Sequence, residues 1–311
     1  MSAPPLRFRP EDVLTHLANA QQPGALAIIV GVEGPSYRPI GAIMACYADG
    51  SRQGILSSGC IEQDVCQHAQ RALETGVPQS LRYGIGSPFF DIQLPCGGGL
   101  DILVVPPPDA AVLADLQDRL SDRVPVRLAF DLETGAFTVD PPEGAHESGM
   151  HFVLDIPPPP RFLVFGKGPE AAAFAALVGS LAYPVTLLSP DPETLFGVGT
   201  EVEGQELTSM RWPEGLTADR FTAVTLFFHD HEWEPPILEG ALATPAFYIG
   251  AQGSLRTRAN RDRAMAELGI TQDQIARCHG PIGLVRSTRD PHSLAVSVLA
   301  EVLDQIQTRT D

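Results

Sequence analysis

The order of apolar and polar positions divides the chain into two parts. Before residue 157, apolar runs such as ALAIIVGV (25–32) and LDILVVP (100–106) alternate with amphipathic segments. This pattern predicts a mixed α/β domain with a substantial β component. Helices are expected at residues 11–20, at residues 62–75 with a stop at Gly76, and at residues 110–120; a strand is expected in AIMACYADG, and a hairpin at residues 126–140 with its turn at Gly135.

After residue 160, apolar strands alternate with helices. The segment RFLVFGKGPEAAAFAALVGSLAYPVTLL predicts a strand, a glycine turn, an alanine-rich helix and a second strand. Such alternation is typical of a doubly wound parallel sheet, and we predict a Rossmann-like domain. Further strands are expected at residues 223–228 and 246–249, and further helices at residues 236–243, 255–268 and 291–307.

Four consecutive prolines lie between the two patterns. Proline cannot continue a helix or a central strand, so Pro157–Pro160 form a stiff spacer. We therefore predict one domain at residues 1–156, a linker at 157–160 and a second domain at 161–311.

Composition and charge narrow the classes of function. The 311 residues are 44% hydrophobic and carry a formal charge of −17, which opposes binding to a nucleic-acid phosphate backbone. No apolar run is long enough for a membrane span, and residues 1–11 do not have the layout of a signal peptide, so a cytoplasmic location is expected. The five cysteines are odd in number and include no C-x-x-C pair, which argues against a disulfide framework or a structural zinc site.

The sequence FGKGPEAA follows a predicted strand and opens a helix. In this context Gly166 and Gly168 let backbone amides approach a phosphate group, and Lys167, the sole lysine, adds a positive charge. Ser189 stands where NAD-binding domains usually have an acidic residue, although Asp191 could substitute for it. A phosphate-bearing ligand, NAD(P) with weaker support, and a tight turn without a ligand all stay open.

Six motifs occur in a fixed order along nearly the whole chain. They are GPSYRPIGA (34–42), SSGCIEQDV (57–65), PCGGGLDILVVP (95–106), HDHEWEPPILEGAL (229–242), YIGAQGSLRTRANR (248–261) and GPIGLVRSTRDPHSLAVSVLAEVL (280–303). Together they resemble the XdhC/CoxI family. The resemblance implies an XdhC/CoxI domain followed by a Rossmann domain. It also implies an accessory protein that binds molybdenum cofactor and helps to place its sulfurated form in xanthine dehydrogenase-type hydroxylases.

The chain departs from the family pattern at four places. The usual S-P-R is Ser36-Tyr37-Arg38, and the usual Gly-Gly-Cys is Ser58-Gly59-Cys60. Phe228 precedes the histidine motif where threonine is usual, and Glu234 replaces an aspartate. The cysteines of the motifs are retained.

A carrier of molybdenum cofactor needs anion donors, flexible backbone and a sulfur ligand for a soft metal. Cys60 lies at a predicted helix start, where backbone amides favour a thiolate, and the charge of Glu62 would partly oppose that effect. Cys96 lies in a glycine turn, and Arg38 is an available planar anion clamp. We predict that cofactor binding in this domain involves Arg38, Ser58, Gly59, Cys60, Glu62, Cys96, Gly97 and Gly98; Cys46 and Cys66 are expected to be small buried hydrophobic residues.

Polar motifs in the second domain could also contact the cofactor. His229 and His231 could bind a metal, but no third ligand is evident nearby, so we predict no metal site and favour a polar contact over helix capping or solvent exposure. Ser254 is expected to cap a helix, and arginines follow it; some could hold phosphate, and at least one is expected in a surface ion pair. The candidate residues here are Gly166, Lys167, Gly168, His229, Asp230, His231, Gly250, Gly253, Ser254 and Arg256.

The favoured function is a chaperone without turnover of its own that binds and protects molybdenum cofactor, assists its sulfuration and inserts it into an apo molybdenum hydroxylase. The expected partners are that hydroxylase and a cysteine desulfurase, and a homodimer is the default assembly. Alternatives are an NAD(P)-dependent oxidoreductase, a scaffold that recruits the desulfurase, and a persulfide carrier that uses Cys60 or Cys96.

Overall fold

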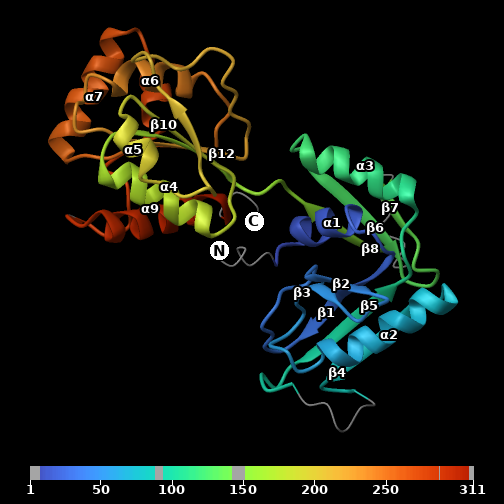
Figure 1. The fold of residues 1–311 in the computed structure, drawn as a ribbon. Helices are drawn as coiled ribbons and strands as arrows, with labels where there is room; N and C mark the ends of the chain where they lie inside the picture. Colours follow the sequence, from blue (N-terminus) through green and yellow to red (C-terminus); the bar gives the residue numbers. More distant parts are fainter. Residues whose placement is uncertain (1–7, 88–93, 142–150, 287, 308–311) are drawn as a thin grey trace. The chain divides into compact units, whose positions relative to one another are not determined.

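The computed structural model describes residues 8–87, 94–141, 151–286 and 288–307. The chain divides into two compact units, and the division falls between Pro158 and Pro159, inside the four-proline segment. Figure 1 shows the elements of each unit. The amino-terminal unit is mixed α/β, and the carboxy-terminal unit is a doubly wound parallel sheet, so the predicted fold class is confirmed.

The amino-terminal unit contains a five-stranded antiparallel sheet in the order β3-β2-β1-β5-β4 and a three-stranded sheet in the order β7-β6-β8. The predicted hairpin is present, because β6 and β7 pair across a turn in which Gly135 has a φ of 69°. The elements are α1 (Pro10–Ala18), β1 (Gly24–Glu33), β2 (Ile43–Tyr47), β3 (Arg52–Gly54), α2 (Glu62–Thr75), β4 (Gln79–Gly84), β5 (Gly99–Val105), α3 (Ala110–Ser121), β6 (Val126–Asp131), β7 (Phe137–Val139) and β8 (His151–Ile156).

Both faces of the five-stranded sheet are covered. Helix α2 packs on one face, where Val65, Ala69 and Ala72 lie among residues of β1, β2, β4 and β5. The opposite face contacts α1 and the three-stranded sheet, through residues such as Leu14 and Phe130. Side chains of a strand alternate between the two faces of a sheet, so a strand that is covered on both faces needs apolar residues on both. The strands β1, β2 and β5 are accordingly apolar at nearly every position.

The carboxy-terminal unit has six parallel strands in the order β11-β10-β9-β12-β13-β14. This is the strand order of dinucleotide-binding folds, with the switch point between β9 and β12. Strand β13 begins two residues after the predicted position. The elements are β9 (Arg161–Gly166), α4 (Pro169–Ser180), β10 (Val185–Ser189), α5 (Pro192–Phe196), β11 (Glu203–Glu206), β12 (Thr222–Phe227), α6 (Glu234–Leu242), β13 (Tyr248–Ala251), α7 (Leu255–Glu267), α8 (Gln272–Ala276), β14 (Cys278–His279) and α9 (Pro291–Gln307).

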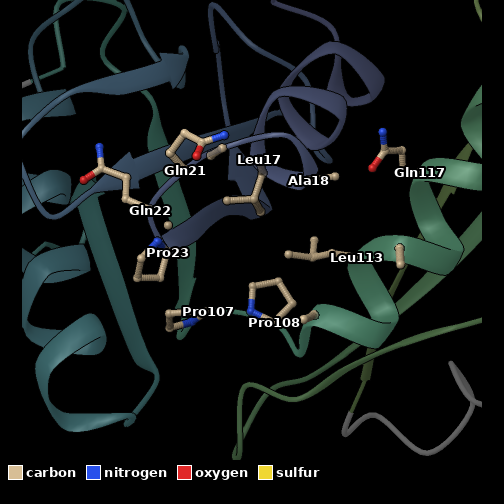
Figure 2. A pocket seen from close by; sticks show the side chains of 13 residues that line it. Leu17, Ala18, Gln21, Gln22, Pro23, Pro107, Pro108, Leu113 and Gln117 are labelled. Carbon is tan, nitrogen blue, oxygen red and sulfur yellow. The ribbon is translucent and has the colours of Figure 1, made fainter.

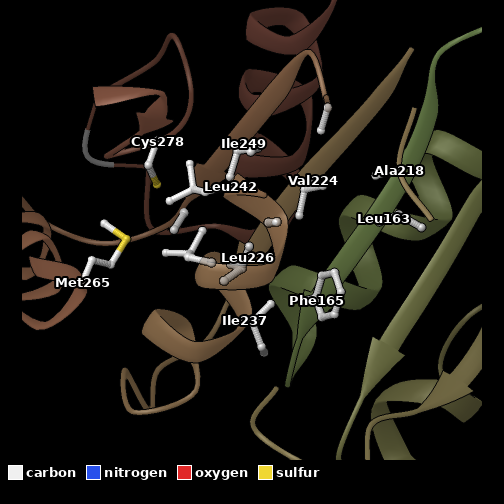
Figure 3. Close-up of a cluster of buried hydrophobic side chains, with 14 of the residues drawn as sticks. Leu163, Phe165, Ala218, Val224, Leu226, Ile237, Leu242, Ile249, Met265 and Cys278 are labelled. Atoms are coloured by element: carbon white, nitrogen blue, oxygen red, sulfur yellow. The ribbon is translucent and has the colours of Figure 1, made fainter. Parts of the chain in front are cut away.

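Two apolar clusters flank this parallel sheet. One joins α4 and α9 to one side of the sheet, through residues such as Phe174 and Val298. The other joins the opposite side to α6 and α7, and Leu226, Ile237 and Met265 belong to it (Figure 3). Within the part of the chain that the structure describes, no helix has the length and apolar character needed to cross a membrane.

A buried ion pair joins α6 to α7. The Nη1 atom of Arg261 lies 3.0 Å from Oε2 of Glu234, and the two side chains are 1% and 0% exposed. Arg261 also donates to the carbonyl oxygen of Gln252, the residue that follows β13. Since a buried charge is tolerated only with a partner, this pair fixes the arrangement of the two helices.

We expect Arg261→Met to lower the free energy of unfolding of the carboxy-terminal unit by about 3–5 kcal/mol, because the carboxylate of Glu234 loses its partner. Urea unfolding, followed by the fluorescence of Trp212 and Trp233 in this unit, measures the change. Arg256→Met, the same replacement at an exposed position of α7, is the control and should leave the midpoint nearly unchanged. Equal midpoints for wild type and Arg261→Met would contradict the assigned role of the pair.

Candidate functional site

The strand order brings three glycine-containing loops to one end of the five-stranded sheet. At this end β1 leads into residues 34–42, β3 leads into residues 55–61, and residues 94–98 lead into β5. The loops carry the motifs GPSYR, SSGC and PCGGG, so segments distant in sequence lie at the same edge. We call this region the glycine-rich end.

Cys60 is an exposed thiol at the glycine-rich end, two residues before α2. Its Sγ atom lies 3.3 Å from Oγ of Ser57, which in turn lies 2.8 Å from Oε2 of Glu62. Glu62 is 1% exposed and also accepts hydrogen bonds from the backbone amides of Leu56, Ser57 and Ile61. The hydrogen bonds to the Glu62 carboxylate thus hold residues 56–61 in a turn around it.

The hydrogen bonds outweigh the cost of burying Glu62. Burial raises the pKa of the Glu62 carboxyl, whereas hydrogen bonds from the hydroxyl and amide of Ser57 and from other backbone amides lower it. The lowering is the larger effect, so the pKa of Glu62 lies below its ordinary value. Glu62 is therefore ionised at neutral pH and can only accept hydrogen bonds.

This charge state settles the direction of the hydrogen bonds. The Ser57 hydroxyl donates its single proton to Glu62, so its oxygen accepts from the amide of Gly59 and from the thiol of Cys60. Cys60 is consequently the donor in this arrangement, and the expected thiolate requires these bonds to change. Ser57, which is not among the site residues predicted from the sequence, thus connects Glu62 to Cys60.

The loop that contains Cys96, residues 94–98, packs closely against the loop that follows β1, residues 34–42. A Cβ atom on Gly98 would lie 2.0 Å from the carbonyl oxygen of Pro35, so only glycine fits there. Gly97 has a φ of 73° and open space around its Cα atom, which leaves its surface accessible. Cys96 is half-buried and packs on the core beneath α2, so its sulfur is less accessible than that of Cys60.

Arg38 has capacity for a ligand. Its Nη2 atom donates to the carbonyl oxygen of Phe8, whereas its buried Nε atom has no hydrogen-bond partner among the residues that the structure describes. Tyr37 and Ile40, on either side, are 59% and 53% exposed. The loop therefore presents an incompletely bonded guanidinium between two apolar groups. Ser58 and Gly59 are exposed in the neighbouring loop, and Gly59 has a φ of 104°.

A cavity of about 340 Å³ lies at the opposite end of the same sheet. It is formed where α1 ends, β1 begins and α3 starts, and Leu17, Pro107, Pro108 and Leu113 line it (Figure 2). None of the predicted site residues lines this cavity.

In the carboxy-terminal unit, the glycine turn is bonded to the protein itself. The amide of Lys167 donates to the carbonyl oxygen of Phe227, and the amide of Gly168 donates to Oγ1 of Thr194. A Cβ atom on Gly166 would lie 2.6 Å from the oxygen of Phe227, so this glycine permits close strand packing. These amides are therefore occupied in the structure.

Asp191 lies beside this turn and caps α5. It accepts hydrogen bonds from the amide and the hydroxyl of Thr194, which lower the pKa of its carboxyl, as does the charge of Lys167. Asp191, which could have bound a ribose, thus holds Thr194, and Thr194 accepts the hydrogen bond from the amide of Gly168. Ser189, at the end of β10, is fully buried.

The histidine motif follows β12 at the carboxyl edge of the parallel sheet. His229 lies 3.4 Å from Glu170 at the start of α4, and His231 lies 3.3 Å from the buried Glu234. Asp230 accepts from the amide of Glu232. Among the described residues, no group of three or more histidine, cysteine or acidic side chains is placed to hold a metal.

The motif after β13 has mainly local contacts. Gly250 has no room for a side chain because Tyr248 and Ile282 approach it, and Ser254 caps α7 by accepting from the amide of Thr257, as predicted. Gly253 has a φ of 140°, and Arg256 is exposed. Arg258 forms the expected surface ion pair, with Asp262.

Comparison with known proteins agrees with this organisation. Family models match residues 17–84, described as the XdhC and CoxI family, and residues 162–302, described as the XdhC Rossmann domain. The molybdenum cofactor insertion chaperone PaoD of Escherichia coli is 33% identical over 278 residues, which are 89% of this chain and 81% of PaoD. The chain belongs to the XdhC and CoxI family. The resemblance seen in the sequence is thereby confirmed.

Two further relatives extend the likeness. A Bacillus subtilis protein, named as a probable subunit of xanthine dehydrogenase, is 25% identical, and the match covers 96% of both chains. A crystal structure of a xanthine dehydrogenase from Bacillus halodurans, 21% identical and covering 97% of both chains, superposes with a TM-score of 0.78. This structural likeness supports the fold. Glu234, one of the four departures from the family pattern noted in the sequence, pairs here with Arg261 and His231.

We expect Glu62→Gln to destabilise the amino-terminal unit by about 1–3 kcal/mol at neutral pH, since a neutral amide cannot accept all the bonds that Glu62 accepts. The folded-state pKa of Glu62 lies below its ordinary value of 4.5, so the stabilisation is complete above that value and is lost as the pH falls through the lowered pKa.

Urea midpoints of wild type and variant, measured from pH 7 to pH 3, test this expectation. The difference should shrink at the acid end. Glu74→Gln, at the exposed end of the same helix, is the control. A difference that grows on acidification would contradict the assigned charge state.

Proposed function

We propose that the protein binds molybdenum cofactor at the glycine-rich end of its amino-terminal unit, protects it, and delivers it to a molybdenum hydroxylase of the xanthine dehydrogenase type. The supporting observation is the 33% identity to the insertion chaperone PaoD over most of both chains. The exposed Cys60, set among glycine loops, is the residue to which we assign the contact with the cargo.

The chemistry of the glycine-rich end suits this cargo. The cofactor is a pterin dithiolene with a phosphate tail and a soft-ligated metal, and thiol sulfur is a ligand that such a metal accepts. Arg38 supplies an incompletely bonded guanidinium for the anionic part, and the open surface at Gly59 and Gly97 permits close approach of the cargo to the backbone.

The hydrogen bonds of Cys60 suit a carrier that must also release its cargo. To bind a metal as a thiolate, Cys60 must lose the proton that it shares with Ser57, and this cost weakens binding. On release, the proton returns to the sulfur and the bond to Ser57 forms again. The recovered thiol–Ser57 hydrogen bond thus favours release of the cargo, so binding is reversible without another group in this loop.

We extend the proposal to assistance in sulfuration, with a cysteine desulfurase as the second partner. An exposed thiol beside the bound cofactor is suitably placed for this step. By contrast, the NAD(P) alternative gains no support from a glycine turn whose Lys167 and Gly168 amides are bonded internally.

We expect Cys60→Ser to weaken cofactor binding by at least about tenfold, because serine oxygen is a poor replacement for sulfur on a soft metal. Cys96→Ser should have a smaller effect, since Cys96 is half-buried. The proteins are produced anaerobically with molybdate, and the oxidised pterin released per folded molecule is measured by fluorescence.

Cys278→Ala, a cysteine replacement in the carboxy-terminal unit, is the control and should retain its pterin. Wild-type pterin content in both Cys60→Ser and Cys96→Ser would remove the thiols from the proposal. A wild type without pterin, although produced with molybdate, would contradict the carrier function itself.

A further inference from the structure

Two other cysteines face each other in the core of the amino-terminal unit. Cys46 lies in β2 and Cys66 in α2, and both belong to the apolar cluster between the sheet and this helix. Cys66 is the neighbour that chiefly raises the pKa of the Cys46 thiol, ahead of burial. Since Cys46 pairs with Ala25, near the start of β1, the Cys46 side chain lies away from the glycine-rich end.

A guanidinium completes this cluster. Arg52 of β3 is the cross-strand partner of Cys46, and directly opposite residues of paired strands project from the same face of a sheet. Arg52 therefore projects from the face of the sheet that α2 covers, and its charge lowers the pKa of the Cys66 thiol. We call Cys46, Cys66 and Arg52 the thiol-pair cluster.

The two thiols differ in acidity. The neighbouring Cys46 thiol lowers the pKa of the Cys66 thiol, and the charge of Arg52 lowers it further, against the effects of burial and of the Glu62 carboxylate. Its neighbour Cys66, together with burial, raises the pKa of the Cys46 thiol. Cys66 is therefore the more acidic of the two thiols.

Access also differs between the two. Cys66 is 8% exposed at the margin of the core, and Cys46 is 1% exposed. A small oxidant would reach Cys66 first, and Cys46 is the thiol next to it. This is the arrangement of a reactive cysteine with a resolving cysteine.

We propose that Cys46 and Cys66 are a redox modification site at which a hydroperoxide produces an intramolecular disulfide. The Cys66 thiolate attacks one oxygen of the hydroperoxide, the O–O bond breaks, and a sulfenic acid and hydroxide (or alkoxide) result. The sulfur of Cys46 then attacks the sulfenic sulfur, the S–O bond breaks, and the S–S bond forms. The thiol proton leaves with the hydroxide as water, and the peroxide has gained the two electrons that the sulfurs lost.

This site is independent of the proposed cofactor function, because it uses neither Cys60 nor Cys96. It has a structural consequence for the same unit, since the disulfide would tie α2 to β2. Glu62 is the first residue of α2, so oxidation would covalently fix the helix that anchors the Cys60 loop.

The full-length reduced protein is treated with hydrogen peroxide, and the remaining thiols are alkylated and counted by mass spectrometry. Cys60 and Cys66 lie in the same tryptic peptide, so the Cys60→Ser variant is used alongside wild type. We expect two fewer alkylated thiols in the variant, a peptide cross-link between Cys46 and Cys66, and recovery of both thiols with dithiothreitol.

Single replacements define the roles. In Cys46→Ser, Cys66 should stop at the sulfenic acid and react with dimedone, and in Cys66→Ser, Cys46 should stay reduced. Arg52→Gln should slow disulfide formation by about tenfold, whereas Arg71→Gln, at an exposed position of α2, should not.

Two outcomes would overturn the proposal. One is a disulfide that joins Cys60 or Cys96 to either member of the pair in the wild-type protein. The other is unmodified Cys46 and Cys66 at a peroxide concentration that already oxidises Cys278, which is buried in the carboxy-terminal unit and whose thiol pKa is raised to about 11, chiefly by burial.

Discussion

Burying an ionised carboxylate costs several kcal/mol unless donors replace the water that it loses. Glu62 meets this requirement with donors that all come from residues 56–61, so burial of the charge and the path of the loop depend on each other. The conformation around Cys60 is thus fixed from inside the protein, before any cargo arrives. A loop ordered in advance loses less entropy on binding than a flexible one.

Glycine has opposite consequences in the two units. At the glycine-rich end, Gly59 and Gly97 have positive φ values and open surroundings, so the backbone there can contact another molecule. In the parallel sheet, Gly166 serves the close packing of β9 on β12, and Thr194 occupies the amide of Gly168. Similar motifs therefore provide an accessible surface in one unit and an internally bonded turn in the other.

The sequence was sufficient for the long apolar elements and for the fold class. Helix α2 begins and ends where predicted, because Gly76 takes the left-handed conformation that ends a helix, and α9 matches its predicted range. Two short strands were not predicted because they lack an apolar pattern in the sequence. Strand β11 is exposed along its length, and β3 has only three residues. Such strands exist because a neighbouring strand offers hydrogen bonds, which sequence periodicity does not reveal.

For the site, the sequence located the loops but not their internal bonds. The motifs placed Cys60, Cys96 and Arg38 in glycine-containing turns, and the structure brings those turns to one sheet end. The role of Ser57 could not be foreseen, because it depends on the turn that returns the chain to Glu62. The spacing of serine three residues before a cysteine and five before a glutamate was the available signal.

Cargo bound at the glycine-rich end of the amino-terminal unit would shield the three loops of that end from solvent. Hydrogen–deuterium exchange of the full-length protein, with and without molybdenum cofactor released anaerobically from a purified hydroxylase, measures this shielding. We expect slower exchange in residues 34–41, 55–61 and 94–98. Protection confined to residues 166–168 and 229–231, with unchanged exchange in those three loops, would contradict it.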